Sequence, residues 1–347
     1  LPQAIESGDV LSVSRELSRM TSDGRRRRLM EAYDVPDVEY SSLSRTMLPI
    51  FHAAHSGTLD VFIAVCGALR SSLAQDEARI STMLTSARDS REMNLLMTAI
   101  AGGNVEIVRL VLKLIDEHDL EIDQKVQMLA GIPDRNETAL MVAVGTRDEE
   151  MVQLVARLIT DGWVPSDERM LMVTARTERG RTALNFAVET CQTAVVNLVV
   201  SVIERTVPAD QVNPLIQNTL QIAISNLLKS ADQANQTRAL DVLAALLKHG
   251  VWPSGKQLSQ ISRAAGFEPA KKCFLDAVCL AVNPLLVGMI LSLQLSHAAG
   301  SGNEGQRQRV ARLQLEVENL VLEVFERLPK TVDGFEESDN ERGGMKA

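Results

Sequence analysis

Histidine and cysteine are the residue types in this chain that could bind a metal ion or act as nucleophiles. The chain has five histidines and four cysteines. His52 and His55 are three positions apart, a spacing that could present two imidazoles of one helix to a zinc ion. No acidic or thiol side chain occurs at a matching spacing. We therefore interpret the two histidines as structural or contact residues rather than as a metal site.

The four cysteines stand apart from one another in apolar segments. None of them has the CxxC spacing of a zinc knuckle or a redox pair, and their positions do not indicate a disulfide framework. We therefore expect a protein of an intracellular, reducing compartment, either cytoplasmic or nuclear. The cysteines are Cys66, Cys191, Cys273 and Cys279.

The sequence motifs of common enzyme classes are missing from the chain. It contains no GxxxxGK[ST] loop for phosphates, no HExxH zinc motif and no GxSxG nucleophile elbow. We therefore predict no catalytic residue, no cofactor and no metal, and we expect that the protein is not an enzyme.

Arg25 to Arg28 form the most conspicuous charge run in a chain whose formal net charge is −9. The overall negative charge disfavours general binding to nucleic acid or to an anionic membrane. We interpret the run as a solvated helix face whose long stems cover apolar surface. A contact of Arg25–Arg28 with nucleic acid or a phosphoinositide is an alternative function. No apolar stretch reaches the roughly 18 residues that a membrane span needs.

The elements that would position these residues are repeated along the chain. The stretch TALMVAVGTRDEEMVQLVARLI (138–159) returns as TALNFAVETCQTAVVNLVVSVI (182–203), with a similar apolar pattern and different polar residues. Such repetition is typical of repeat architectures. We use one alanine of the first apolar segment, the anchor alanine, to mark each copy. The anchor alanines are Ala4, Ala53, Ala99, Ala143, Ala187, Ala223 and Ala277, and the intervals from Ala53 to Ala223 are 46, 44, 44 and 36 residues.

Each strong copy is expected to form two helices joined by a tight turn. Apolar residues recur at spacings of three and four on both sides of the turn, which is the period of a helix with one buried face. The turn position holds Gly57 and Gly103 in two copies, where a residue without Cβ most easily adopts the left-handed conformation, and Arg147 and Gln192 in two others. Aromatic residues make up only 3% of the chain, so its aliphatic core favours an all-α fold.

The copies resemble ankyrin repeats, whose pattern includes TPLHxAA, a turn glycine and a second helix. The stretches MLPIFHAAHSG, NLLMTAIAGGNVEIVRLVL and GRTALNFA carry this resemblance. Ankyrin units have about 33 residues, so about 10 residues of each copy are left over. Asp76, Asp123, Ser166 and Asp210 are possible N-caps before short amphipathic segments, which predicts an additional helix in most copies. We expect an all-α chain built as an α-solenoid of divergent ankyrin-like repeats; armadillo-like three-helix repeats are the alternative.

The predicted organisation begins with a repeat array over residues 1–298. A Gly/Ser-rich linker (299–306), a closing helix (307–329) and a disordered tail (330–347) follow it. Within the array, residues 229–236 are predicted to form a surface loop, and the segment around Tyr33 and Tyr40 a packed connection. Because the chain begins with Leu1 rather than Met, we expect it to be part of a larger protein whose targeting signals are not visible here.

The ankyrin resemblance implies binding to a protein partner through the first helices and the segments before them. We therefore predict a noncatalytic scaffold that presents a variable repeat surface to a protein. The alternatives are the regulatory half of an enzyme or a secreted effector with a cryptic site. Carried onto this sequence, the predicted protein-binding residues are His55, Ser56, Arg135, Glu137, Thr146, Arg179, Arg181, Glu189 and Asn226.

Overall fold

The computed structural model describes residues 1–31, 33–36, 44–73, 76–89, 91–131, 135–230 and 232–249, together with residues 253, 257, 260 and 261. The chain divides into two compact units, Leu1–Val242 and Leu243–Ala347. The predicted anchor Ala277, the linker (299–306), the closing helix (307–329) and the tail (330–347) lie outside the described residues.

Almost all of the regular structure in the described residues is helical, which confirms the all-α prediction. The helices are α1 (Pro2–Glu6), α2 (Val10–Arg19), α3 (Ser22–Met30), α4 (Pro49–His55), α5 (Leu59–Leu73), α6 (Glu77–Ser86), α7 (Leu95–Ala101), α8 (Val105–Glu117), α9 (Ile122–Ala130), α10 (Ala139–Thr146), α11 (Glu149–Arg157), the π-helical turn η1 (Leu158–Gly162), α12 (Ser166–Thr174), α13 (Ala183–Glu189), α14 (Thr193–Thr206), α15 (Ala209–Lys229) and α16 (Gln233–Lys248).

Two short strands form an antiparallel ribbon between α3 and α4. In this ribbon β1 (Tyr33–Pro36) pairs with β2 (Ser44–Met47), with Tyr33 opposite Met47. The sequence predicted only a packed connection here. The ribbon was missed because strands of four residues are too short to show the alternation of apolar and polar residues that identifies a strand.

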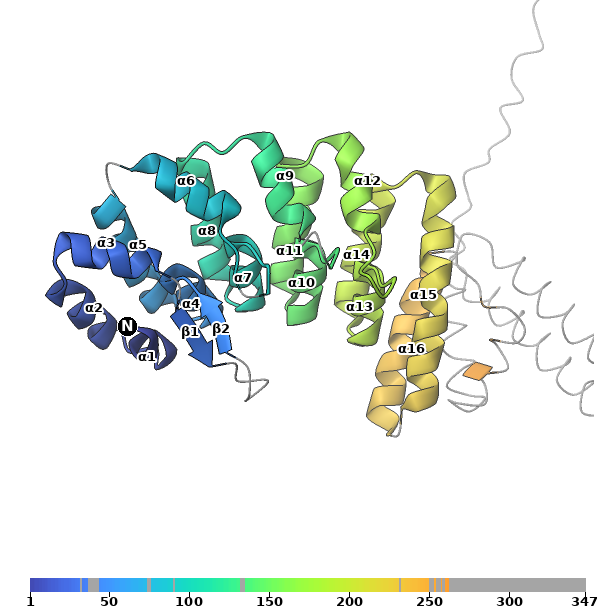
Figure 1. Cartoon of the computed structure of the whole chain (residues 1–347). Coiled ribbons are helices and arrows are strands. Elements are labelled where there is room, and N and C mark those ends of the chain that lie inside the picture. The colour runs from blue at the N-terminus through green and yellow to red at the C-terminus, as the bar shows by residue number, and fades with distance from the viewer. Residues whose placement is uncertain are drawn as a thin grey trace, which may run out of the picture. The chain divides into compact units, whose positions relative to one another are not determined.

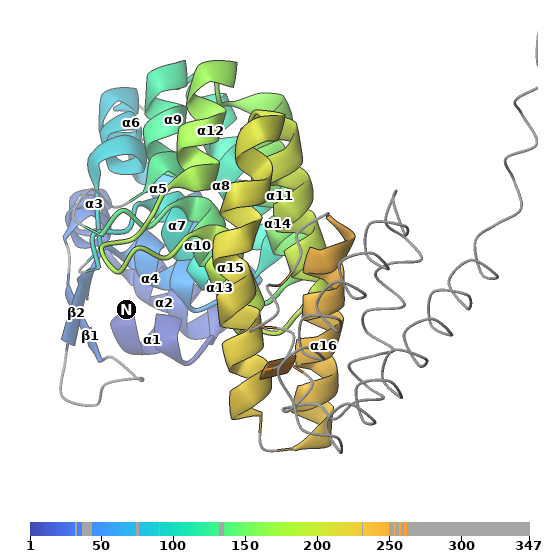
Figure 2. The same cartoon turned by 90° about the vertical axis from the view of Figure 1, so that its right-hand side faces the viewer.

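The helices of the first unit lie in three rows (Figures 1 and 2). The first row is α4, α7, α10 and α13, and each of these helices packs against the next. The second row is α5, α8, α11 and α14, and each member also packs against the first-row helix that precedes it in sequence. The third row is α6, α9 and α12, and these helices occupy the segments for which the sequence predicted an additional helix. That part of the fold prediction is therefore confirmed.

Each first-row helix contains one anchor alanine, and two further anchor alanines lie in α1 and α15. Ala53, Ala99, Ala143 and Ala187 are fully buried, and Ala4 in α1 and Ala223 in α15 are nearly so. A methyl side chain lets two helices approach closely because it fills little of the space between them. This burial explains why the same small residue recurs while the polar positions change.

Three of the four first-row helices, α7, α10 and α13, begin with a side chain that caps the exposed backbone N–H groups. Thr138 accepts a hydrogen bond from the Met141 N–H before α10, and Thr182 accepts one from the Asn185 N–H before α13. Asn94 does the same before α7. Such caps each stabilise a helix by about 1 kcal/mol. The repeated TAL motif is thus a helix start.

The turn after each first helix places one residue in the left-handed conformation, four positions after the anchor alanine. The predictions for Gly57 (φ 69°), Gly103 (φ 75°) and Arg147 (φ 63°) are confirmed. The prediction for Gln192 is wrong, because Cys191 (φ 54°) takes the left-handed position and Gln192 is the N-cap of α14. Gly8 has the same conformation after α1. The turn therefore follows the anchor at a constant distance, whatever residue stands there.

Close contacts join the turn after α4 to the turn after α7. The Asn104 side chain, which caps α8, donates from Nδ2 to the Gly57 carbonyl oxygen at 2.8 Å. A Cβ atom on Gly102 would lie only 2.4 Å from the Ala54 carbonyl oxygen. A side chain at position 102 would therefore force α4 and α7 apart, which accounts for glycine at the end of α7.

The N-termini of the third-row helices are capped differently from the prediction. Asp76 does precede α6, but its carboxylate pairs with Arg26 and Arg79 instead of capping the helix. Glu121 rather than Asp123 caps α9, through a reciprocal capping box with Gln124. Ser166 and Asp210 are likewise not caps but first-turn residues of α12 and α15, which begin at Ser166 and Ala209. An acidic or hydroxyl side chain suits the first turn of a helix as well as its cap, so the sequence misplaced these starts by one or two residues.

The copy around Ala223 departs from helix, turn and helix. One continuous helix, α15, runs through the predicted N-cap Asp210 and through Ala223. No glycine occurs between residues 209 and 229, and Pro214 near the helix start does not break the helix. The following loop is short: α16 begins at Gln233, so the prediction of a loop over residues 229–236 is wrong at both ends.

Candidate functional site

His52 and His55, the candidate metal pair, differ in their surroundings. Burial, together with the smaller effect of the charge of His55, lowers the pKa of His52 to about 4. His52 is therefore neutral near pH 7 and lies in the core of the first unit, whereas His55 is half-buried. Within the described part of the chain, no three His, Cys, Asp or Glu side chains lie close enough together to hold a metal ion.

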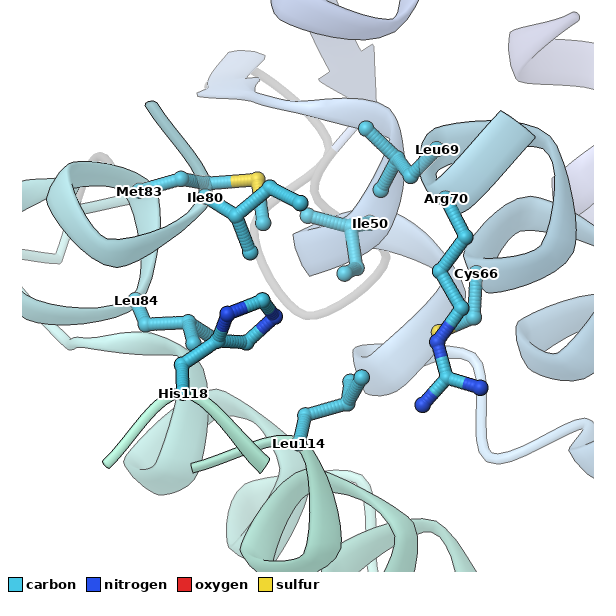
Figure 3. A pocket seen from close by; sticks show the side chains of 9 residues that line it. All are labelled: Ile50, Cys66, Leu69, Arg70, Ile80, Met83, Leu84, Leu114 and His118. Carbon is cyan, nitrogen blue, oxygen red and sulfur yellow. The ribbon is translucent and has the colours of Figure 1, made fainter. Parts of the chain in front are cut away.

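A small apolar pocket lies where α6 packs on α5 and α8 (Figure 3). Ile80, Met83 and Leu84 of α6 point toward Cys66 of α5 and Leu114 of α8. Its volume of about 20 Å³ has room for about one water molecule, so it is a packing seam rather than a cofactor site. Burial raises the pKa of the Cys66 thiol to about 12, so this cysteine is not a reactive thiolate.

The arginine run is largely used inside the fold. Arg25 donates to the carbonyl oxygens of Leu17 and Met20 at 2.8 and 3.4 Å and so completes the end of α2. Arg26 pairs with Asp76 across the approach to α6. Arg27 is exposed. Two of the four guanidinium groups thus bind the end of α2 and the residue before α6, so Arg25 and Arg26 do not belong to the predicted solvated helix face.

Tight turns precede the first-row helices α7 and α13, and their hydrogen bonds are equivalent. Before α7, the Asp89 N–H donates to the Met93 carbonyl oxygen at 3.0 Å, and the Met93 N–H donates to Asp89 Oδ1 at 2.9 Å. Before α13, the Thr177 N–H donates to the Arg181 carbonyl oxygen at 2.9 Å, and the Arg181 N–H donates to Thr177 Oγ1 at 3.2 Å. The two turns thus have one backbone design with different side chains.

The segment before α10 shares one feature with these two turns, a residue with positive φ. Glu92, Asn136 and Gly180 all have positive φ, at 64°, 50° and 72°, and each stands two residues before the N-cap of its first-row helix. We call residues 89–93, 135–137 and 177–181 the tip turns.

An arginine stands at the same position of each tip turn. Arg91, Arg135 and Arg179 follow one another at intervals of 44 residues (91 to 135 and 135 to 179), and each directly precedes the left-handed residue. The sequence analysis named Arg135 and Arg179 but missed Arg91. The 44-residue interval between the anchor alanines was the signal that could have found it.

A cavity of about 440 Å³ opens between the second and third tip turns. Four predicted site residues, Arg135, Glu137, Arg179 and Arg181, line it together with Thr177, Glu178 and Phe186. Arg181 is held in place, because its guanidinium lies 4.6 Å from the centre of the Phe186 ring and its Nε donates to Glu189 Oε1 at 3.1 Å. The structure therefore brings five of the nine predicted residues together, counting Glu189.

The remaining predicted residues lie outside this cavity. The hydroxyls of Ser56 and Thr146 donate to the carbonyl oxygens of the anchor alanines Ala53 and Ala143, at 2.9 and 2.7 Å. Asn226 donates from Nδ2 to the Val188 carbonyl oxygen at 3.0 Å and so joins α15 to α13. These polar atoms close helix ends and helix contacts.

No protein-family model matches this chain, and no curated protein sequence matches it either. Among the described helices, none combines the length and the apolar character that crossing a membrane requires.

Proposed function

We propose that this chain is a noncatalytic scaffold that binds a protein partner, built as a divergent, extended ankyrin-like α-solenoid. The proposal is supported by the recurrence of one unit: a capped first helix, a buried anchor alanine, a left-handed turn and a second helix. Units of this kind bury their apolar faces against their neighbours and leave their outer residues free to vary. We therefore expect the variable outer residues to determine which partner is bound.

The cavity between the second and third tip turns is the observation that carries the proposal. It is open, it is lined mostly by charged side chains, and backbone hydrogen bonds between Thr177 and residues 180 and 181 close the third tip turn beside it. Preorganised polar groups beside an aromatic ring suit recognition of another polypeptide, because little side-chain freedom is lost on binding. We assign the partner-binding face to this cavity and to the row of tip turns.

Affinity capture with a charge-reversed variant tests this function. Proteins that the purified chain retains would be identified and then bound as purified proteins to three versions of the chain. These are wild type, Arg135→Glu/Arg179→Glu, and Arg205→Glu/Arg238→Glu. The last pair changes the net charge equally at exposed helix positions away from the cavity. We expect the control to bind like wild type and the tip-turn variant to lose the partner. Equal retention by all three versions would refute this face, and failure of wild type to retain any protein would refute the function.

A further inference from the structure

The charges of the tip turns are held apart rather than paired with each other. Arg135 and Arg179 line the same cavity as Glu137 and Glu178, yet no ion pair joins these four side chains. Neither arginine pairs with any other residue that the structure describes. Arg181, by contrast, is already neutralised by Glu189. Two guanidinium groups are thus available to anions from outside the chain.

The spacing of the tip arginines follows from helix packing. The first-row helices α7, α10 and α13 lie against one another in succession, and packed helix axes are about 8–10 Å apart. Residues at the same position of successive copies should therefore repeat at about that distance. In a polyproline II segment, side chains three residues apart point to the same side and are separated by roughly 9 Å. An extended segment of a partner can thus match the row of tip turns.

The glutamates limit which anion fits. A nucleic acid strand carries a negative charge on every nucleotide and would place phosphates next to Glu137 and Glu178, in a chain whose net charge is already −9. Separate carboxylates can pair with the arginines while neutral or basic residues lie beside the glutamates. The arrangement of charge therefore favours a polypeptide over a polyphosphate.

We propose, resting on the protein-binding function above, that the tip turns recognise an extended segment of the partner with acidic side chains at every third position. One carboxylate pairs with Arg135 and the next with Arg179, in the two-point geometry that guanidinium groups favour. Neutral or basic residues separate the acidic ones and face Glu137 and Glu178.

The test uses a library of random 12-residue peptides displayed on phage and selected on the full chain. We expect the enriched peptides to share two acidic residues three positions apart. As synthetic peptides, they should bind Arg135→Glu/Arg179→Glu at least about tenfold more weakly than wild type, since a hydrogen bond to a charged group contributes about 1.5–3 kcal/mol. The control Arg205→Glu/Arg238→Glu should bind within about twofold of wild type, given the small contribution of surface charges far from a site. Circular dichroism would show that all variants remain folded.

A charge swap sharpens the result. Replacing the second acidic residue of the peptide by lysine should abolish binding to wild type and restore it to Arg179→Glu. Enriched peptides without the acidic pair, or undiminished binding to Arg135→Glu/Arg179→Glu, would overturn the proposal. Competition by a single-stranded oligonucleotide at equal strength would instead assign the row to nucleic acid. If wild type retains a protein partner but selects no acidic peptide, this proposal fails and the scaffold function stands; if it retains neither, both fail.

Discussion

The first and third tip turns have the same backbone hydrogen bonds but opposite surroundings. In the first, the carboxylate of Asp89 is buried and accepts hydrogen bonds from the backbone of Arg91 and Met93. In the third, Thr177 takes the same place, and the cavity lies beside it. One turn design can therefore be closed into the core or opened to a partner, depending on a few side chains.

The residue before the anchor alanine shows the same contrast. His52 and Thr98 are buried at this position, and Thr98 Oγ1 lies 3.4 Å from Asp89 Oδ2. Phe186, the equivalent residue in α13, is half-exposed and lines the cavity. This side of the unit is thus packed into the core in the α4 and α7 copies and is partly exposed in the α13 copy.

The largest effect is expected at the entrance to the second tip turn. Gly131 has a φ of 98°, and a Cβ atom there would lie 1.6 Å from the Glu137 carbonyl oxygen. Gly131→Ala should lower the free energy of unfolding by about 3–5 kcal/mol, because both strain and a backbone clash must be relieved. Gly180→Ala in the third tip turn meets no atom within 4 Å and should cost only about 1–2 kcal/mol. Urea unfolding of both variants measures the difference, and similar costs would contradict it.

Asp89 and Thr177 provide the second test. Asp89→Ala removes a buried acceptor from two backbone N–H groups and should destabilise the protein by about 2–4 kcal/mol. Thr177→Ala removes a single neutral, half-buried hydrogen bond and should cost about 1 kcal/mol. Unfolding midpoints by circular dichroism would show the order. A larger loss for Thr177→Ala would refute the contrast between the closed and the open turn.

The buried His52 should make stability depend on pH. The folded state lowers the pKa of His52 from 6.5 to about 4, so the unfolded chain binds a proton more readily between these values. This contribution to stability is complete above pH 6.5 and is lost as the pH falls toward 4, by about 2–3 kcal/mol in all. Urea unfolding at pH 7 and 4.5 should show a smaller difference for His52→Gln than for wild type. An equal difference would assign the pH dependence to other groups.

The smallest effect on stability is expected for the arginines of the third tip turn. Arg181→Ala loses contacts with Phe186 and Glu189 and should destabilise the protein by about 0.5–1 kcal/mol. Arg179→Ala should change stability by less than about 0.5 kcal/mol, because it is exposed and unpaired among the described residues. Thermal unfolding followed by partner binding would separate the two, since we expect Arg179→Ala to weaken binding without a stability change.

Local patterns in the sequence predicted the helices, the turns and the additional third-row helices. They did so because a buried helix face imposes a period that any copy must keep, as around Ala143 and Ala187. The separate additional helix predicted after Asp210 was wrong, because residues 209–229 form one continuous helix in spite of Pro214. Local patterns did not predict the ion pairs. Arg26–Asp76 and Arg181–Glu189 join side chains of different segments, so they depend on how those segments pack together.

The site was predictable in part for the same reason. Arg135, Glu137, Arg179 and Arg181 could be named because they precede first-row helices, and the structure gathers them in one cavity. Which side chains would remain open to a partner could not be foreseen, since Asp89 and Thr177 look equally polar in the sequence. Burial distinguishes them, and burial is a property of the packed neighbours.

Gly102 sets how closely two neighbouring helices approach, since its missing side chain admits the Ala54 carbonyl oxygen. A larger residue there would act as a wedge and lengthen the step between adjacent copies. Because the tip turns precede α7, α10 and α13, such a wedge would move all of them away from α4 together and leave the spacing among them unchanged.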